Sequence, residues 1–140
     1  MNTSALCIIA LTAMVASPTA QAADTTLTLA CKGTTTITGM EPEPISMGLI
    51  VNFTAGTVQG FGSPSIMNYP VKIKGINDVT IDFAGFQEFF AGTQEASIRG
   101  SIDRVTGDVE ATSTVMATKT KKTIISTSYS LKCRPTQRMF

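Results

Sequence analysis

Histidine is absent from this chain of 140 residues, and its absence excludes several kinds of active site. Catalytic arrangements of serine, histidine and aspartate, or of cysteine and histidine, need an imidazole as the general base. A zinc site built on imidazole ligands is excluded for the same reason. An enzyme with this sequence would have to work with carboxylates, or with serine and lysine.

The carboxylates offer few pairs for acid and base catalysis. Glu41 lies close in sequence to Glu43, and Asp103 lies close to Asp108 and Glu110; glycosidases use two carboxyl groups about 5 to 10 Å apart. The first pair falls in a proline-containing loop and the second flanks a predicted hairpin turn, so both are more simply solvated turn residues. The second segment also offers oxygens for weak Ca²⁺ binding, but it matches no established loop pattern. We therefore predict no cofactor and no metal site.

Cysteine is scarce, with Cys7, Cys31 and Cys133 as its three occurrences. Cys7 lies in a segment that we expect to be removed, which leaves an even pair. In an oxidising compartment such a pair predicts a disulfide. A bond that encloses about 100 residues stabilises by roughly 4 to 5 kcal/mol in the chain-entropy description, less any strain in the native state.

The amino-terminal segment has the features of an export signal. Residues 5–16 form an apolar run of about a dozen residues, shorter than the roughly 20 that cross a bilayer as a permanent helix. Pro18 and the small-x-small sequence Ala20-Gln21-Ala22 follow it, which is the pattern that signal peptidases cleave. We predict a signal peptide over 1–22 and a single domain over 23–140, periplasmic or secreted.

Charge is balanced overall but unevenly distributed. All ten acidic residues lie within 24–110, together with five basic ones, whereas 111–140 holds six basic residues and no acid. A basic edge that meets an acidic partner is one interpretation. The simpler one, which we favour, is that the C-terminal strands lie beside acidic strands and the charges largely neutralise each other.

Alternation of apolar and polar residues with period two, rich in Thr, Val and Ile and interrupted by glycine, predicts an all-β fold. On the clearest such stretch, Val79, Ile81 and Phe83 share the face that we expect in the core. Arg104 to Gly107 reads as a hairpin turn, with Gly107 suited to a positive φ. The expected strands are residues 27–31 (continued by 34–38), 47–53, 57–61, 71–74, 77–83, 97–103, 108–116 and 123–133, with 86–90 either a strand or one helical turn and 41–44, 62–70 and 134–140 outside the sheet.

The cysteine pair constrains the topology. If Cys31 and Cys133 are bonded, their Cα atoms lie about 5.5 Å apart, so the first and last strands are neighbours. An up-and-down antiparallel β-barrel pairs its first strand with its last and has no exposed edges. We predict a small barrel, with a β-sandwich as the alternative.

Candidate binding residues come from aromatic and basic clusters. Six phenylalanines and two methionines serve either as core, which we favour, or as the lining of an apolar cavity: Phe53, Phe61, Phe83, Phe86, Phe89, Phe90, Met47 and Met67. Phe89 and Phe90 are the pair we expect to be partly exposed. The turn that carries Lys119, Lys121 and Lys122 lacks interleaved aromatics, which argues against nucleic-acid binding.

A membrane-spanning barrel is disfavoured by the last predicted strand and the residues after it. Such barrels need strands of roughly 9 to 11 residues with an unbroken apolar face. Here Lys132, Arg134, Pro135 and Arg138 lie close together instead. We therefore expect no membrane span.

Three short segments carry a resemblance: Leu29-Ala30-Cys31-Lys32-Gly33, Ile102-Asp103-Arg104-Val105-Thr106-Gly107 and Tyr129-Ser130-Leu131-Lys132-Cys133. In these, the chain resembles small exported β-domain proteins of Gram-negative bacteria with no assigned function. The opening strand is also similar to that of periplasmic lysozyme inhibitors, which are small disulfide-tied barrels. Neither resemblance supplies site residues.

These observations favour a non-enzymatic binding domain. It would bind an unknown protein through loops such as 41–44, 62–70 and 117–122, or a small apolar ligand at the mouth of the barrel. An inhibitor of a secreted hydrolase such as lysozyme, and a carboxylate-based enzyme, are the alternatives.

Overall fold

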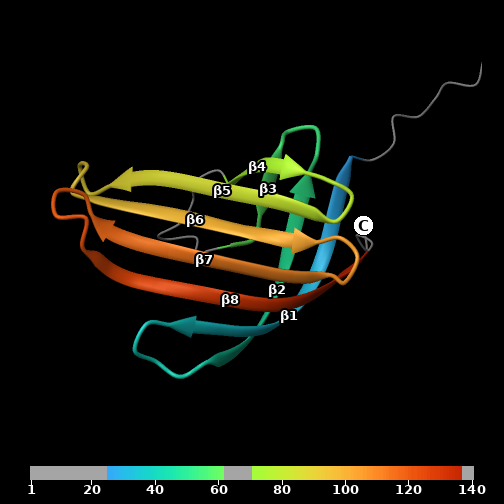
Figure 1. Ribbon diagram of the computed structural model, residues 1–140, viewed down its shortest axis with the longest axis horizontal. Coiled ribbons are helices and arrows are strands. Elements are labelled where there is room, and N and C mark those ends of the chain that lie inside the picture. The colour runs from blue at the N-terminus through green and yellow to red at the C-terminus, as the bar shows by residue number, and fades with distance from the viewer. Residues whose placement is uncertain (1–24, 62–70, 137–140) are drawn as a thin grey trace, which may run out of the picture.

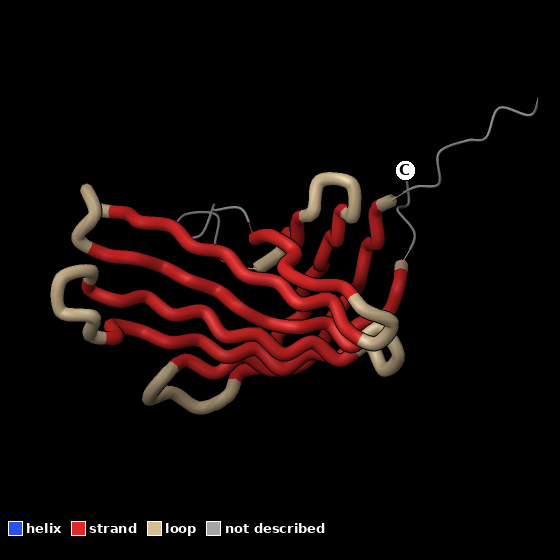
Figure 2. The backbone as a smooth tube through the Cα atoms, turned by 45° about the horizontal axis from the view of Figure 1, so that its top comes forward, coloured by secondary structure: helices blue, strands red, loops and turns tan. Residues whose placement is uncertain are grey.

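The computed structural model describes residues 25–61 and 71–136, and the predicted signal peptide and the loop 62–70 lie outside them. Eight strands account for most of the described residues (Figure 1; Figure 2). Within those two ranges, no helix has the length and apolarity that crossing a membrane requires. The strands are β1 (Thr26–Ile37), β2 (Glu43–Asn52), β3 (Thr57–Gln59), β4 (Val71–Ile76), β5 (Thr80–Phe89), β6 (Gln94–Asp103), β7 (Asp108–Ala117) and β8 (Thr123–Pro135).

Every strand pairs antiparallel with the next, and β8 returns to pair with β1, so the sheet closes into a barrel. Cys31 lies directly opposite Cys133 in the register of β1 and β8, and the two form a disulfide with a Cα separation of 4.0 Å. The predicted all-β barrel and the disulfide between first and last strands are confirmed. The Cα separation is shorter than expected because directly opposed residues on antiparallel strands can approach to about 4.5 Å even without a bond.

The core lies inside the barrel and follows the alternation of the sequence. At its centre, the ring of Phe61 stacks on Phe83 with centroids 5.1 Å apart and meets Tyr129 edge to face at 5.5 Å. Aromatic pairs in these arrangements add about 0.5 to 1.5 kcal/mol beyond burial. The other buried apolar residues are Leu29, Cys31, Leu49, Val51, Val58, Val71, Ile81, Ala96, Ile98, Ile102, Val109, Ala111, Val115, Leu131 and Cys133.

The barrel is uneven, since β5 to β8 are long and β3 and β4 are short. Figure 1 shows β5 to β8 running side by side, with the later part of β2 at a steep angle to them and β4 beside β5. β4 pairs only with the beginning of β5, up to Ala84. The remainder of β5, from Gly85 to Phe89, therefore extends with β6 beyond the reach of β4.

Several expected boundaries differ from the structure. Val79 was expected in the core, and this is wrong: it is 49% exposed. The Asn77 side-chain oxygen accepts hydrogen bonds from the backbone N–H groups of Val79 and Thr80, both at 2.8 Å, so the chain makes an Asx-type turn there and the strand starts only at Thr80.

Two prolines expected outside the sheet belong to strands. Pro44 pairs with Thr34 near the start of β2, and Pro135 pairs with Leu29 at the end of β8. Proline is accepted at strand beginnings and edges because the missing N–H donor is not needed there. Residues 86–90 were expected to form either a strand or one helical turn, and residues 86–89 are part of the strand β5.

The phenylalanines divide into two groups. Phe61 and Phe83 are core residues as expected, whereas Phe53, Phe86 and Phe90 are exposed by 38%, 56% and 70%. Their exposure corrects the expectation that most phenylalanines are needed as core. Phe89 is half-buried against the core, and Met67 lies outside the described residues.

We expect Gly100→Ala to destabilise the barrel. A Cβ atom at Gly100 would lie 2.5 Å from the Glu110 carbonyl oxygen, 2.6 Å from Cζ of Phe83 and 2.7 Å from Cβ of Ala111. Overpacking of this kind costs about 1 to 3 kcal/mol. Gly48→Ala is the matched control, because its Cβ would meet nothing nearer than 3.8 Å. Urea unfolding checks both, and equal midpoints would contradict the packing argument.

Candidate functional site

A hollow of about 430 Å³ lies at one end of the barrel, where β1 begins and β6 and β8 end. We call it the barrel mouth. Pockets for small ligands typically measure about 300 to 1,000 Å³ and are mostly apolar. Its lining residues are Thr26, Leu27, Leu29, Phe53, Ile81, Ile102, Asp103, Arg104, Gly107, Cys133 and Pro135.

The floor of the barrel mouth is made by core residues. Leu29, Ile81 and Ile102 are each at most 5% exposed, and the inward phase of their strands directs them into the barrel. Leu27 is half-buried one inward position nearer the beginning of β1, and Phe53 follows β2. The mouth is thus an apolar surface that the core leaves partly open to solvent.

The polar rim of the mouth is held by its own hydrogen bonds. The Asp103 carboxylate accepts the backbone N–H groups of Val105 and Thr106, both at 2.8 Å. These bonds, the one from Thr106 first, hold the pKa of Asp103 below its ordinary value. The Arg104 guanidinium donates a hydrogen bond to the backbone carbonyl oxygen of Asn77 at 2.6 Å. Such a rim gives the apolar hollow a fixed border.

Asp108, the other carboxylate of this turn, is also engaged. It accepts a hydrogen bond from Lys132 Nζ at 2.8 Å and another from the Thr106 hydroxyl at 2.6 Å. The bond from Lys132, followed by that from Thr106, lowers the pKa of Asp108. A general acid near neutral pH needs a raised pKa, so neither Asp103 nor Asp108 has the protonation behaviour for that role. Among the described residues, no group of three or more cysteine, aspartate or glutamate side chains lies close enough together to hold a metal ion.

The binding residues suggested by the sequence lie at the opposite end from the mouth, on two neighbouring turns. Phe89 and Phe90 enter the turn between β5 and β6, with ring centroids 5.1 Å apart. Lys119, Lys121 and Lys122 belong to the turn between β7 and β8. Figure 2 shows both turns at the same end of the long strands.

Two contacts tie these turns together. The Thr118 N–H donates to the carbonyl oxygen of Thr93 at 3.0 Å. Lys121 Nζ donates to both carboxylate oxygens of Glu95, at 3.0 and 2.8 Å. The side chain of Glu95 is only 7% exposed, so Lys121 supplies the positive charge that a buried carboxylate requires.

The role of Glu95 was missed from the sequence, which did not single this residue out. Its partner lies 26 residues away, on a turn that only the register of β6 and β7 brings close. The ion pair between Glu95 and Lys121 also bears on how the basic charges of residues 111–140 are neutralised. Lys121 and Lys132 are neutralised by acids on neighbouring elements, in line with the favoured interpretation of the basic C-terminal segment, whereas Lys119 and Lys122 form no ion pair within the described ranges.

We expect Lys121→Met to destabilise the protein by about 1 to 3 kcal/mol, because a buried Glu95 carboxylate would lose its charged partner. Lys122→Met is the matched control on the same turn and should change stability by less than about 0.5 kcal/mol. Thermal or urea unfolding checks the difference. A Glu95→Gln, Lys121→Met double variant should recover part of the loss, and equal effects of the two lysine variants would contradict a structural role for Lys121.

No family model, no curated protein and no solved structure matches this chain. The resemblances suggested by the three short segments therefore stay predictions.

Proposed function

We propose that this protein is an exported, non-enzymatic binding protein that holds a small apolar ligand at the barrel mouth. The observation that carries the proposal is the hollow of about 430 Å³ whose floor is apolar and whose rim exposes Phe53. An aromatic side chain left 38% exposed beside buried leucine and isoleucine offers surface that a ligand can remove from water.

The barrel interior limits the size of the ligand. Phe83 lies two residues further along β5 than Ile81 and is packed against Phe61. Because these rings and Tyr129 occupy the middle of the barrel, a ligand at the mouth cannot run through the interior as it does in wide carrier barrels. The proposal is therefore a compact ligand, such as an aromatic ring system or a short acyl chain.

The compartment is part of the same proposal. Disulfides persist in oxidising environments such as the periplasm or the extracellular space, and the Cys31–Cys133 bond is consistent with such a location. A ligand binder there needs a scaffold that survives without cytosolic chaperones, and a closed barrel with a covalent tie supports that requirement.

The test uses N-phenyl-1-naphthylamine, a neutral apolar dye whose fluorescence rises on leaving water. We expect the oxidised protein to bind it saturably, and Phe53→Ala to weaken binding by about tenfold because part of an aromatic contact surface is lost. Phe86→Ala is the matched control, since Phe86 is 56% exposed but lies on β5 away from the mouth lining.

Two results would count against the proposal. Identical binding by Phe53→Ala and Phe86→Ala would place the dye elsewhere on the surface. Absence of saturable dye binding, together with a protein that carries no added mass in native mass spectrometry when recovered from the exported fraction, would argue against an apolar-ligand role.

A further inference from the structure

The outer face of the seam between β1 and β8 carries three basic side chains in close register. Lys32 lies directly opposite Lys132, and Arg134 lies opposite Ala30 on the next outward row. All four residues are exposed. Directly opposed residues of antiparallel strands have Cβ atoms about 4.5 to 5.5 Å apart, and like charges in such positions destabilise the pair. We call Lys32, Lys132, Arg134 and the small residues between them the basic seam.

Within the described ranges, one of the three cations has an acidic partner. Lys132 forms an ion pair with Asp108 of β7 at 2.8 Å. Lys32 and Arg134 make no ion pair within residues 25–61 and 71–136. Glu110, the next outward acid on β7, instead accepts a hydrogen bond from the Ser130 hydroxyl at 2.6 Å. Among the residues that the structure describes, the basic seam therefore keeps two positive charges without an ion-pair partner.

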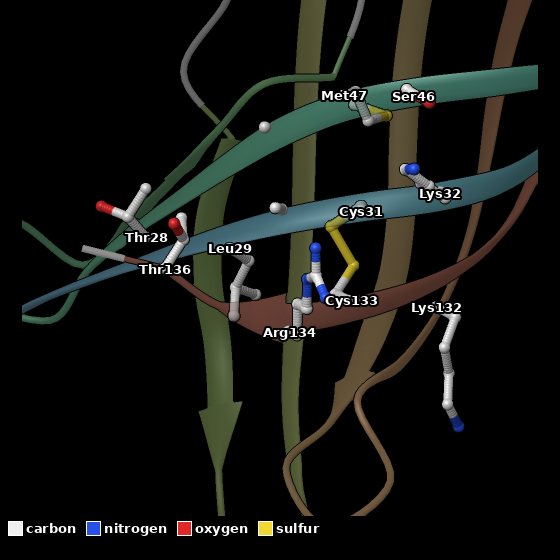
Figure 3. A pocket seen from close by; sticks show the side chains of 12 residues that line it. Thr28, Leu29, Cys31, Lys32, Ser46, Met47, Lys132, Cys133, Arg134 and Thr136 are labelled. Carbon is white, nitrogen blue, oxygen red and sulfur yellow. A yellow bond between two sulfur atoms is a disulfide. The ribbon is translucent and has the colours of Figure 1, made fainter. Parts of the chain in front are cut away.

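The seam is hollowed as well as charged. Ala30 pairs with Gly48 of β2 on one side and with Arg134 on the other, so two small residues lie between larger neighbours. The resulting hollow measures about 700 Å³ and includes Lys32 and Ser46, which lie opposite each other on β1 and β2. In Figure 3, Arg134 extends from β8 towards β1 beside the disulfide, whereas Lys132 points away from this region.

We infer that the basic seam binds a tetrahedral oxyanion, with Lys32 and Arg134 as the two cations and the Ser46 hydroxyl as an additional donor. Arginine binds phosphate and sulfate groups through parallel N–H donors, and lysine adds a compact charge. An oxyanion between Lys32 and Arg134 also screens the repulsion between Lys32 and Lys132. Leu29 and Cys133 line both hollows, but Lys32, Ser46 and Arg134 line the seam and not the barrel mouth. The oxyanion site therefore does not depend on the proposed apolar ligand.

A small phosphorylated or sulfated molecule fits the seam better than a membrane surface. Peripheral binding to anionic lipid combines basic residues with apolar side chains that insert among the acyl chains. The residues that line the hollow around Lys32 and Arg134 include Thr28, Ala30, Ser46, Gly48 and Thr136, which are small or polar. The large exposed apolar side chains Phe86, Phe90 and Ile124 are not among the residues that line this hollow.

Inorganic phosphate is the probe, added at constant ionic strength with chloride as the balancing anion. We expect saturable shifts of backbone amide resonances confined to residues around Lys32 and Arg134. Lys32→Gln and Arg134→Gln should each weaken phosphate binding by about tenfold, as expected for loss of one charged hydrogen bond. Lys122→Gln is the control, because Lys122 is exposed on the distant turn.

Lys32→Glu gives an independent measurement on the same site. It places an acid opposite Lys132, so the variant should unfold at a higher temperature than the natural protein in phosphate-free buffer and should lose the phosphate response. A decrease in its unfolding temperature, or a phosphate response that survives in Lys32→Glu, would overturn the inference.

Vesicles distinguish the source of the oxyanion. The protein should bind phosphate but should not sediment with phosphatidylglycerol vesicles any more than with phosphatidylcholine vesicles. Sedimentation with the anionic vesicles that Lys32→Gln abolishes would replace the small-molecule proposal with a lipid surface. Equal weakening in Lys122→Gln, or shifts that chloride alone reproduces, would reduce the effect to general screening and overturn the site.

Discussion

The closure of β1 on β8 is the constraint on which the rest of the structure depends. These strands come from the two ends of the described chain, and their pairing runs from Leu29 opposite Pro135 to Ile37 opposite Thr127. Bringing such distant segments together carries the largest loop-closure cost in the fold. The disulfide between Cys31 and Cys133, 102 residues apart, removes much of that cost from the unfolded chain, by roughly 4 to 5 kcal/mol in the chain-entropy description.

The closure also determines where the two hollows lie. The inward residues Leu29 and Cys133 contribute to the barrel mouth, and the outward residues Lys32 and Arg134 form the basic seam. Gly33 is part of the same closure, because a Cβ atom there would collide with the backbone of Ser130 and Leu131. A larger residue at that position would push β8 away from β1 and open both sites at once.

The sequence predicted the parts of the fold that depend on local pattern and on the cysteine pair. Period-two alternation identified most of the strands, and the two cysteines made the first and last strands neighbours, which favoured a barrel over a β-sandwich. The glycine of the turn before β7 was also identified, since Gly107 has a φ of 77°. These features follow from residues close in sequence or joined by one covalent bond.

The features that sequence reasoning missed depend on register between strands. Glu95 is neutralised by Lys121 only because the two hairpin turns lie together, and the opposition of Lys32 to Lys132 requires the register of the closure. Val79 followed the alternation yet is exposed, because a single asparagine side chain competes with the strand for its backbone N–H groups. Local hydrogen bonds of this kind override a period-two pattern at strand ends.

One two-stranded ribbon thus presents different chemistry on its two faces. Along β1, Leu29 and Cys31 point into the apolar core while Ala30 and Lys32 point to solvent, and β8 repeats the arrangement with Cys133 and Arg134. An apolar ligand at the mouth would contact inward side chains, whereas an oxyanion on the seam would contact the outward Lys32 and Arg134, although Leu29 and Cys133 line both hollows. Binding at one hollow could change affinity at the other only by shifting β1 and β8. Because the disulfide fixes the position of these two strands, we expect the oxidised barrel to hold the two sites as independent binding surfaces.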